Sequence, residues 1–238
     1  MSILVLTHAD LAEPEVTGAW VGHFRDRGKM ACPVDARTGA GLGPLRRLME
    51  GGDRPAAERR NWWIVGLPNT GKSSLANRLT GRAKAATGGR PGITRGEQYL
   101  RAGDLELVDT PGLLWPRAAG LTVLHLLGAV ESGEEARETA ARDLLKYVAG
   151  VHPHRLGKRY GWSEGTGEGD EDLLAWVGRS RGCLSSGGKV NLQRAAQVVL
   201  DDFRMGKLGR LSLERPPDMA AGGEMSAEFP ATREETEN

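Results

Sequence analysis

"VGLPNTGKSS", residues Val65–Ser74, is the stretch that decides the fold of the first half of this chain. It fits the pattern G-x-x-x-x-G-K-[ST] through Gly66, Gly71, Lys72 and Ser73. In this pattern backbone N–H groups surround phosphate oxygens, the lysine reaches the β and γ phosphates, and the hydroxyl ligates Mg²⁺. The apolar run Asn61–Gly66 predicts a buried strand, and "KSSLANRLTG" predicts a helix that ends at Gly81. The sequence therefore predicts a phosphate-binding loop at a helix N-terminus.

The composition is that of an ordinary soluble protein with room for one large domain or two modest ones. The chain has 238 residues, of which 39% are hydrophobic and 26% charged, and its net charge is +1. The net charge of the whole chain therefore indicates no class of binding partner. Cys32 and Cys183 fit no metal-ligand spacing and predict reduced thiols. No apolar run approaches 18 residues, which predicts a chain that neither spans a membrane nor is secreted.

A second nucleotide-related motif follows the loop. "LELVDTPG", residues Leu105–Gly112, predicts a strand that runs into Asp109-x-x-Gly112. An aspartate at a strand end holds the Mg²⁺ shell, and a glycine N–H can meet the γ-phosphate. The polar segment Gly88–Gly96 lies between the two motifs, and its Thr94 is predicted to close on Mg²⁺ and the γ-phosphate as a switch.

The motif that reads guanine is absent from its usual place. No lysine after Gly112 is followed by x-Asp, as [N/T]-K-x-D would require. Upstream, however, the apolar run Ile3–Leu11 contains Thr7-His8-Ala9-Asp10, and a helix-like segment and the strand-like "KMACPVDA" follow it. Along the chain, the predicted guanine-binding motif therefore comes first. It is followed by the loop that contains Ala36, the phosphate-binding loop, the switch segment and the Asp-x-x-Gly motif. This order is that of a circularly permuted GTPase.

The wording of these motifs resembles one family. "ADLAEPEVTGAW", "GLPNTGKSSLANRL", "TGGRPGITRG", "LVDTPGLLWPR" and "GKLGRLSLE" are similar to the phrases of the circularly permuted ribosome biogenesis GTPase A family (YlqF type), whose mitochondrial relatives are ribosome-associated GTPases. The resemblance covers about residues 3–214. It implies an α/β fold, a circularly permuted P-loop GTPase with three αβα layers and a mostly parallel sheet, followed by a small C-terminal helical domain. It also implies GTP hydrolysis coupled to maturation of the large ribosomal subunit. The residues alone would indicate only a Mg²⁺-dependent nucleotide hydrolase.

The resemblance assigns roles residue by residue. Asp10 matches the aspartate that binds guanine, and Ala36 the alanine whose backbone faces the guanine carbonyl. The GTP/GDP-binding set is Thr7, His8, Asp10, Ala36, Gly66, Pro68, Asn69, Thr70, Gly71, Lys72, Ser73, Ser74 and Gly112. The residues expected to act in hydrolysis are Lys72, Thr94 and Asn69. The metal ligands are Ser73, Thr94 and Asp109 for Mg²⁺, and Asn69 for K⁺.

Two departures from the usual pattern affect these expectations. Thr7-His8 stands where Asn-Lys is usual, which removes an amide contact and the lysine stem that covers the base; the histidine ring could stack there instead. Leu113 stands where many GTPases place a glutamine that orients water. We therefore expect slow intrinsic turnover that depends on the cation and on the ribosome.

The N-terminus is short for this architecture. Only Met1 and Ser2 precede Ile3, whereas permutation should begin the sheet one strand and one crossover helix earlier. The absent strand would lie between the base-reading strand and the phosphate-loop strand. We expect these two strands either to pair or to leave a gap of one strand's width. The expected domains are a GTPase domain at 1–117 that lacks this strand and helix, a helical domain at 118–215 and a flexible tail at 216–238.

The second half predicts helices and local basic clusters. Asn191–Gly206 has one apolar face, an N-cap asparagine and a terminal glycine, and shorter helical stretches occupy Leu121–Val130, Glu134–Val148 and Glu171–Val177. The segments "KYVAGVHPHRLGKRY" and "RSRGCLSSGGKVNLQR" contain no acidic residue. Such local excess suits phosphate contacts, but a solvated surface explains it equally well. With the resemblance, it favours ribosomal RNA. The tryptophans Trp62, Trp63 and Trp176 are predicted to lie in the core.

Two classes of function remain open. The first is a GTP-hydrolysing switch that binds a precursor of the large ribosomal subunit in the bacterial cytoplasm, a location favoured over the mitochondrial matrix. The second is a ribosome- or RNA-binding module whose nucleotide site is degenerate or inactive. Neither requires a membrane or an obligate oligomer. Measurable binding of guanine nucleotides discriminates between them.

Overall fold

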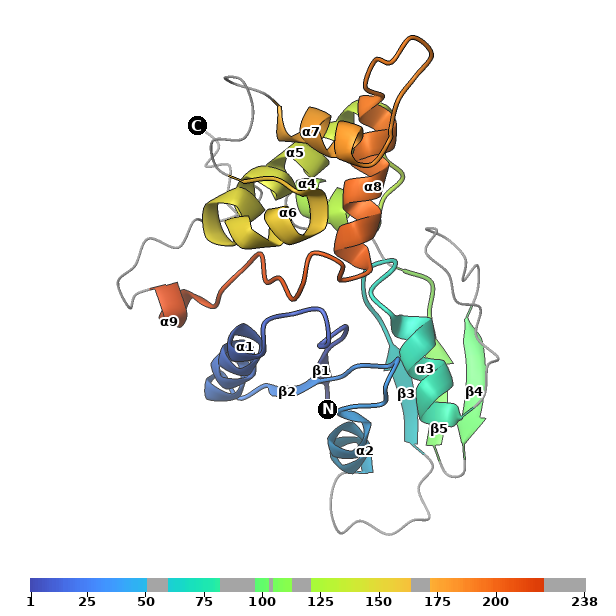
Figure 1. Cartoon of the computed structure of the whole chain (residues 1–238). Coiled ribbons are helices and arrows are strands. Elements are labelled where there is room, and N and C mark those ends of the chain that lie inside the picture. The colour runs from blue at the N-terminus through green and yellow to red at the C-terminus, as the bar shows by residue number, and fades with distance from the viewer. Residues whose placement is uncertain (51–59, 82–96, 103–104, 113–120, 164–171, 221–238) are drawn as a thin grey trace, which may run out of the picture. The chain divides into compact units, whose positions relative to one another are not determined.

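The computed structural model describes residues 1–50, 60–81, 97–102, 105–112, 121–163 and 172–220. The chain divides into two compact units, Met1–Ala118 (unit 1) and Ala119–Asn238 (unit 2). Unit 1 is a mixed α/β structure, and the described part of unit 2 is almost entirely helical (Figure 1).

Unit 1 begins with a parallel pair of strands and two helices. In chain order these are β1 (Ile3–Leu6), α1 (Pro14–Asp26), β2 (Met30–Pro33) and α2 (Leu42–Glu50). β1 and β2 pair in parallel from Ile3 opposite Met30 to Leu6 opposite Pro33. Parallel neighbours need a crossover, which α1 provides. Pro14 suits the first turn of that helix, because a backbone N–H at this position would have no acceptor within the helix and its absence costs no hydrogen bond.

The other described residues of unit 1 form a three-stranded sheet with one helix against it. Its elements are β3 (Arg60–Ile64), α3 (Lys72–Thr80), β4 (Gln98–Ala102) and β5 (Leu105–Asp109), and the strand order is β3-β5-β4. β3 and β5 are parallel, whereas β4 and β5 are antiparallel. β4 was not predicted from the sequence, although Gly103-Asp104 between two strand-like runs is a hairpin signal. The sheet is mixed because β4 returns antiparallel beside β5.

The described strands form two separate sheets rather than one, and two of their three pairings are parallel, as the sequence predicted. Of the two arrangements expected for β1 and β3, the base-reading and phosphate-loop strands of the sequence prediction, the structure has the one in which they do not pair. A shared apolar core holds the two sheets together. Its most buried members are Cys32, Val34, Leu45, Met49, Leu75, Ala76, Leu79, Leu100 and Leu107. Because β2, α2 and α3 all contribute, unit 1 has one core beneath two sheets.

Unit 2 is built from helices that surround a second core. Its helices are α4 (Leu121–Leu127), α5 (Glu134–Val151), α6 (Pro153–Tyr160), α7 (Leu173–Ser180), α8 (Leu192–Arg204) and the short α9 (Pro217–Ala220). α5 and α8 pack against each other and are contacted by α4 and α7 (Figure 1). The predicted caps of α8 are confirmed, because Asn191 Oδ1 accepts from Arg194 N and Gly206 adopts a left-handed φ of 69°.

Two further expectations need correction. α6 lies in the segment that the sequence analysis interpreted only as basic, since Pro153 can begin a helix at its first position. Trp63 is 53% exposed rather than in the core. Successive side chains of a strand point to opposite faces of the sheet. Because Trp62 packs on the core of unit 1, its neighbour Trp63 points to the opposite face.

Candidate functional site

The loop between β3 and α3 has a strongly curled backbone. Gly66, Asn69 and Gly71 have φ values of 153°, 59° and 82°, all positive. Glycine adopts such values without strain, which explains two of the three positions. The Thr70 hydroxyl donates to the Leu67 carbonyl at 2.8 Å and so closes the loop on itself.

Lys72 opens α3 and bends back over this loop. Its Nζ donates to the Leu67 carbonyl at 2.7 Å, and only 9% of the residue is exposed. Burial lowers the pKa of Lys72, while the nearby charge of Asp109 opposes that shift. A neutral carbonyl compensates an enclosed ammonium poorly, so an added anion such as phosphate would stabilise its charged form.

Ser73 and Asp109 join the start of α3 to the end of β5. The Ser73 hydroxyl donates to Asp109 Oδ2 at 2.7 Å. Asp109 is fully buried, and its Oδ1 has no hydrogen-bond partner among the described residues. Burial raises the pKa of Asp109, and the Ser73 hydrogen bond and the Lys72 charge only partly oppose this.

This donor set fits magnesium bound together with phosphates. A hydroxyl and a carboxylate with an uncompensated oxygen are hard oxygen ligands of the kind that Mg²⁺ prefers. No three His, Cys, Asp or Glu side chains gather into a metal cluster within the described ranges. Ser73 and Asp109 would supply a hydroxyl and a carboxylate, a donor set that suits Mg²⁺ that also binds substrate phosphates.

The end of the Asp-x-x-Gly motif touches the phosphate loop. A Cβ added to Gly112 would lie 2.6–2.7 Å from atoms of Pro68, so no larger residue fits there. The Thr110 hydroxyl donates to the Ile64 carbonyl at 2.8 Å and ties the ends of β5 and β3 together. The structure thus brings both predicted phosphate motifs into contact.

The predicted base-reading segment also reaches this loop. Thr7 Oγ1 donates to the Thr70 carbonyl at 2.6 Å. His8 has a left-handed φ of 53°, and its Nε2 would lie 3.0 Å from a Cβ on Gly71. The His8 ring therefore rests against the phosphate loop in this structure, and Thr7 and His8 occupy one site with Thr70 and Gly71.

Asp10 and the turn that contains Ala36 form the outer part of the site. Arg37 Nη2 lies 3.2 Å from Asp10 Oδ2, and the side chain of Asp10 is 19% exposed. Asp35 shapes the turn, because its carboxylate accepts from the Arg37 N–H at 2.8 Å and from the Thr38 hydroxyl. Burial alone would raise the pKa of Asp35, but these hydrogen bonds outweigh it and lower the pKa.

Asp35 and Arg37 were not among the predicted site residues. An aspartate shortly before a threonine in a turn is a signal for this side-chain-to-backbone arrangement. Among the predicted site residues, Ser74 is exposed on the first turn of α3. Thr94 and Leu113 lie outside the described residues, so the predicted switch and the water-orienting position have no structural account.

Among the described helices, none is long and apolar enough to cross a membrane.

Comparisons with known proteins agree with these features. Residues 61–157 match the profile of a family described as "50S ribosome-binding GTPase". Ribosome biogenesis GTPase A from Bacillus cereus is 34% identical over 232 residues, which cover 91% of this chain and 77% of that protein. The protein of the same name from Thermotoga maritima is 31% identical, with 92% of this chain and 78% of that protein covered.

Two solved structures share the fold. A GDP-bound structure of TM YlqF has a TM-score of 0.61 at 25% identity and covers 90% of this chain and 83% of that one. The GNP-bound YlqF from T. maritima has a TM-score of 0.60 at the same identity, with 90% and 82% covered. The chain has the P-loop GTPase fold of YlqF and belongs to the ribosome biogenesis GTPase A family.

Proposed function

We propose that this chain binds and hydrolyses GTP as an assembly factor for the large ribosomal subunit in the bacterial cytoplasm. The Ser73–Asp109 contact carries the proposal, together with the orphaned Asp109 Oδ1 and the enclosed Lys72. These three side chains meet at the N-terminus of α3, where partial positive charge favours phosphate. The family membership supports the coupling to ribosome assembly.

Each side chain has a defined task in this proposal. Lys72 places its ammonium on the β and γ phosphates, which offsets the cost of its burial. Ser73 and Asp109 would hold Mg²⁺, with Thr94 as a further predicted ligand. When bound, that ion would neutralise charge on the transferring phosphoryl group.

We further propose that the GTPase domain is circularly permuted and reads guanine from its N-terminal segment. Thr7 and His8 precede the phosphate loop by about sixty positions in the sequence and yet contact it. Asp10 would accept from the guanine N1–H and 2-amino group, and the Ala36 backbone would face its carbonyl. Guanine is therefore favoured over adenine.

Nucleotide binding tests the phosphate and base assignments separately. Lys72→Ala should abolish measurable GTP binding, whereas Lys29→Ala, at an exposed lysine after α1, should leave it unchanged. Asp10→Asn should weaken GTP and raise tolerance for xanthine nucleotides, whose 2-position accepts rather than donates. Tight GTP binding by Lys72→Ala, or unchanged selectivity in Asp10→Asn, would contradict the corresponding assignment.

Potassium is proposed as a further cofactor of slow hydrolysis. Asn69 sits in the phosphate loop with a left-handed φ of 59° and would share the ion with phosphate oxygens. A cation there would take part of the role of an arginine finger, which is worth on the order of 10³–10⁵ in rate. Hydrolysis should be faster in potassium than in sodium, with and without large subunits. Asn69→Ala should remove that difference, and Asn77→Ala on α3 should retain it.

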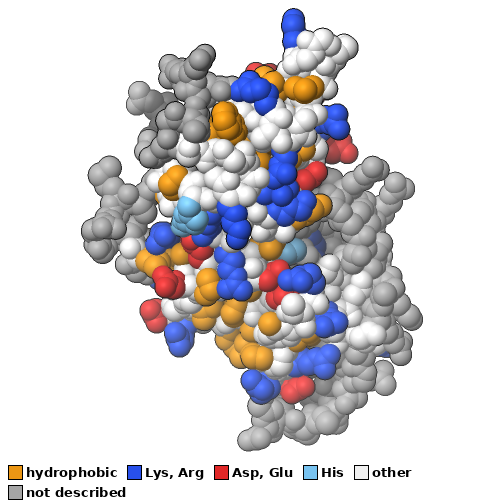
Figure 2. All heavy atoms as spheres, viewed as in Figure 1, with side chains coloured by type: hydrophobic (Ala, Val, Ile, Leu, Met, Phe, Trp, Pro, Cys, Tyr) orange, Lys and Arg blue, Asp and Glu red, His pale blue; other side chains and the backbone are white. Residues whose placement is uncertain are grey.

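Unit 2 is proposed to bind ribosomal RNA on the large-subunit precursor. Lys and Arg side chains are spread over the face of this unit that Figure 2 shows. The exposed basic residues of the two acid-free segments are Lys146, Lys158, Arg179, Arg181, Lys189 and Arg194. The double variant Lys158→Glu/Arg179→Glu should weaken RNA binding. It should also reduce the slope of log affinity against log salt concentration by the amount expected for about two phosphate contacts. The matched reversal Arg25→Glu, in unit 1, should not.

One observation favours the alternative of a binding module with a degenerate nucleotide site. Arg37 already pairs with the Asp10 carboxylate that guanine would need. The pair is largely exposed on the arginine side and so costs little to open. Calorimetric titration with GDP and GTP decides between the two functions. If no binding is measured at millimolar nucleotide, the binding module with a degenerate site is supported, whereas measurable binding supports the GTPase.

A further inference from the structure

The two sheets of unit 1 divide the proposed nucleotide site. In the part of the chain that the structure describes, β1 pairs with β2, and β3, β5 and β4 form the other sheet (Figure 1). Asp10 and Ala36 follow strands of the first sheet, whereas the phosphate loop follows β3 of the second. Because no described strand pairing joins the sheets, other contacts must fix the distance between the guanine and phosphate subsites.

Between described residues of the two sides, three side chains donate hydrogen bonds across this boundary to backbone carbonyls. The pairs are Thr7 Oγ1 to Thr70 O at 2.6 Å, Arg78 Nη2 to Thr38 O at 3.0 Å, and Arg46 Nη2 to Leu79 O at 2.7 Å. We call Thr7, Arg46 and Arg78 the clasp.

The clasp converges on α3 and the residues at its ends. Thr70 lies just before its N-terminus, Arg78 projects from it, and Leu79 lies in its last turn. Arg46 comes from α2, and its cation at the C-terminal end of α3 also suits the helix dipole. The helix that carries the phosphate loop is thus tied to the base-reading side at both ends.

Arg78 acts directly on the turn that contains Ala36. Its acceptor, Thr38, belongs to the turn organised by Asp35. A Cβ on Gly39 would lie 3.1 Å from Arg78 Nη2, so the backbone of this turn passes close beside the guanidinium. The hydrogen bond therefore holds the Ala36 backbone at a set distance from α3.

The shared apolar core cannot set this distance alone. Burial of apolar surface is non-directional, so it favours contact between the halves without fixing their register. Hydrogen bonds to carbonyls are directional and weaken steeply when distorted. We propose that the clasp residues are positioning residues that set the spacing between the guanine and phosphate subsites. This inference rests on the proposed binding of guanine nucleotides.

A comparison of two ligands tests the clasp. GDP spans both subsites, so its affinity depends on their spacing, whereas inorganic pyrophosphate uses only the phosphate loop. In the full chain with Mg²⁺, Thr7→Val and Arg78→Met should each weaken GDP by about threefold to tenfold. Binding of pyrophosphate, measured by the same calorimetry, should change by less than about twofold.

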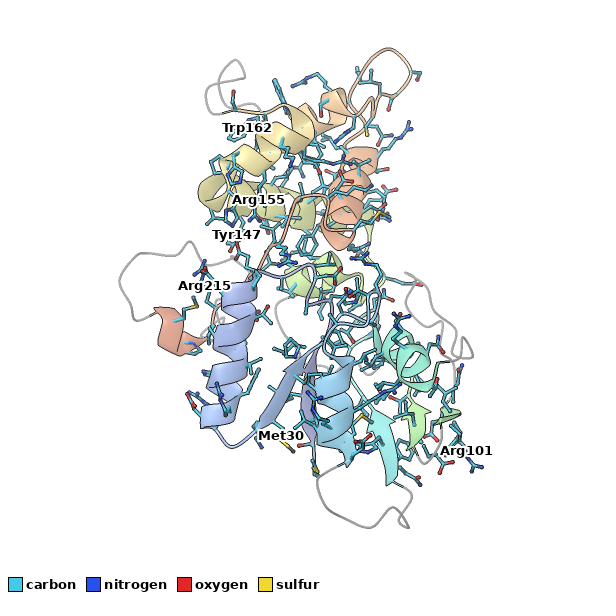
Figure 3. The ribbon with its side chains drawn as sticks, turned by 60° about the horizontal axis from the view of Figure 1, so that its bottom comes forward. Met30, Arg101, Tyr147, Arg155, Trp162 and Arg215 are labelled. Carbon is cyan, nitrogen blue, oxygen red and sulfur yellow. The ribbon has the colours of Figure 1, made fainter. Side chains whose placement is uncertain are left out.

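Matched variants separate positioning from folding. Thr7→Ser and Arg78→Lys keep a donor and should recover most of the GDP affinity. Thr80→Val removes a hydroxyl that bonds within α3. Arg101→Met alters an arginine on β4, at the edge of one sheet (Figure 3), that pairs with Glu106 of the neighbouring strand. Both should bind GDP like the wild type. Thermal unfolding of each variant shows whether the fold is retained.

The possible failures are distinguishable. If the wild-type chain and the double variant Thr7→Val/Arg78→Met bind GDP equally well, the proposal about the clasp is wrong, while the proposed function stands. Equal loss of GDP and pyrophosphate also overturns it, because the phosphate loop itself would then be damaged. A wild-type chain that binds no guanine nucleotide overturns the proposed function and the clasp with it.

Discussion

Among the described residues, the most enclosed carboxylates of the two units have opposite surroundings. Asp109 in unit 1 and Asp202 in unit 2 are 0% and 2% exposed. Asp109 accepts one hydrogen bond, from Ser73, and leaves Oδ1 without a partner among the described residues. Asp202 accepts four: two from Arg159 at 2.7 Å, one from Tyr160 at 3.1 Å and one from Lys207 at 3.2 Å.

The pKa directions follow from these partners. Burial raises the pKa of Asp109, because one hydroxyl and a nearby lysine do not compensate the lost hydration. Burial alone would also raise the pKa of Asp202, but the hydrogen bonds from Arg159 and Lys207 reverse the shift and lower it. A saturated carboxylate holds a fold together, whereas an incompletely satisfied one is free to accept a further cation. The contrast therefore distinguishes a carboxylate with a structural network from the carboxylate of the proposed nucleotide site.

The largest expected effect is the loss of the Asp202 network. Asp202→Ala leaves the Arg159 guanidinium without its buried partner, which typically costs about 3–5 kcal/mol. The free energy of unfolding, from urea titrations followed by circular dichroism, should fall by that amount. Asp201→Ala is the control, because Asp201 is far more exposed and its arginine contact is 3.8 Å long. Equal losses in the two variants would remove the distinction.

The second effect tests the proposed magnesium ligand Asp109 and has two opposite parts. Asp109→Asn should weaken GTP at least about 100-fold in Mg²⁺, or about 2.7 kcal/mol, because it removes the charge that would hold the ion. The nucleotide-free protein should instead gain up to about 1 kcal/mol, since an uncompensated buried charge is gone. Calorimetry measures the first part and thermal unfolding the second. Destabilisation of the nucleotide-free protein would show that Asp109 is structural.

The third prediction concerns pH. The pKa of Asp202 is lowered on folding, so its stabilisation is present above the unfolded value of about 3.9 and is lost as the pH falls through the lowered pKa. The pKa of Asp109 is raised, so its destabilising effect is absent below about 3.9 and grows as the pH rises through the raised pKa. The unfolding free energies of Asp109→Asn and wild type should therefore converge as the pH falls toward 4. Those of Asp202→Asn and wild type should still differ there, and convergence of both pairs would contradict the assignment.

The smallest effect is the removal of a single donor from the saturated site. Burial and the charge of Asp202 raise the pKa of Tyr160 far above its usual value, so the phenol stays a neutral donor. Tyr160→Phe should cost about 1 kcal/mol of unfolding free energy, because the other donors remain. Tyr99→Phe is the control: that tyrosine is 63% exposed and bonds to Glu97 nearby, so no measurable change is expected.

The sequence predicted the local parts of unit 1 well and their connections poorly. The strand, loop and helix around Lys72 are confirmed because glycine positions and apolar runs determine them locally. The exposed face of Trp63 could not be foreseen, because a strand pattern does not say which face another element covers. β4 was not predicted, although Gly103-Asp104 is a local hairpin signal. Whether β1 and β3 pair was left open by the sequence, because it depends on contacts between segments far apart in the chain.

By itself the sequence determined the chemistry of the candidate site: the residue types, their order along the chain and the phrases that indicate the family. These are local properties, since a loop motif needs only its own residues to be recognised. The tertiary structure decided which groups meet. It alone placed Thr7 on Thr70, Gly112 against Pro68 and Arg78 beside the Ala36 turn, and it alone left Asp109 Oδ1 without a partner among the described residues. The reason is physical, because hydrogen-bond satisfaction and burial depend on contacts between segments far apart in the chain.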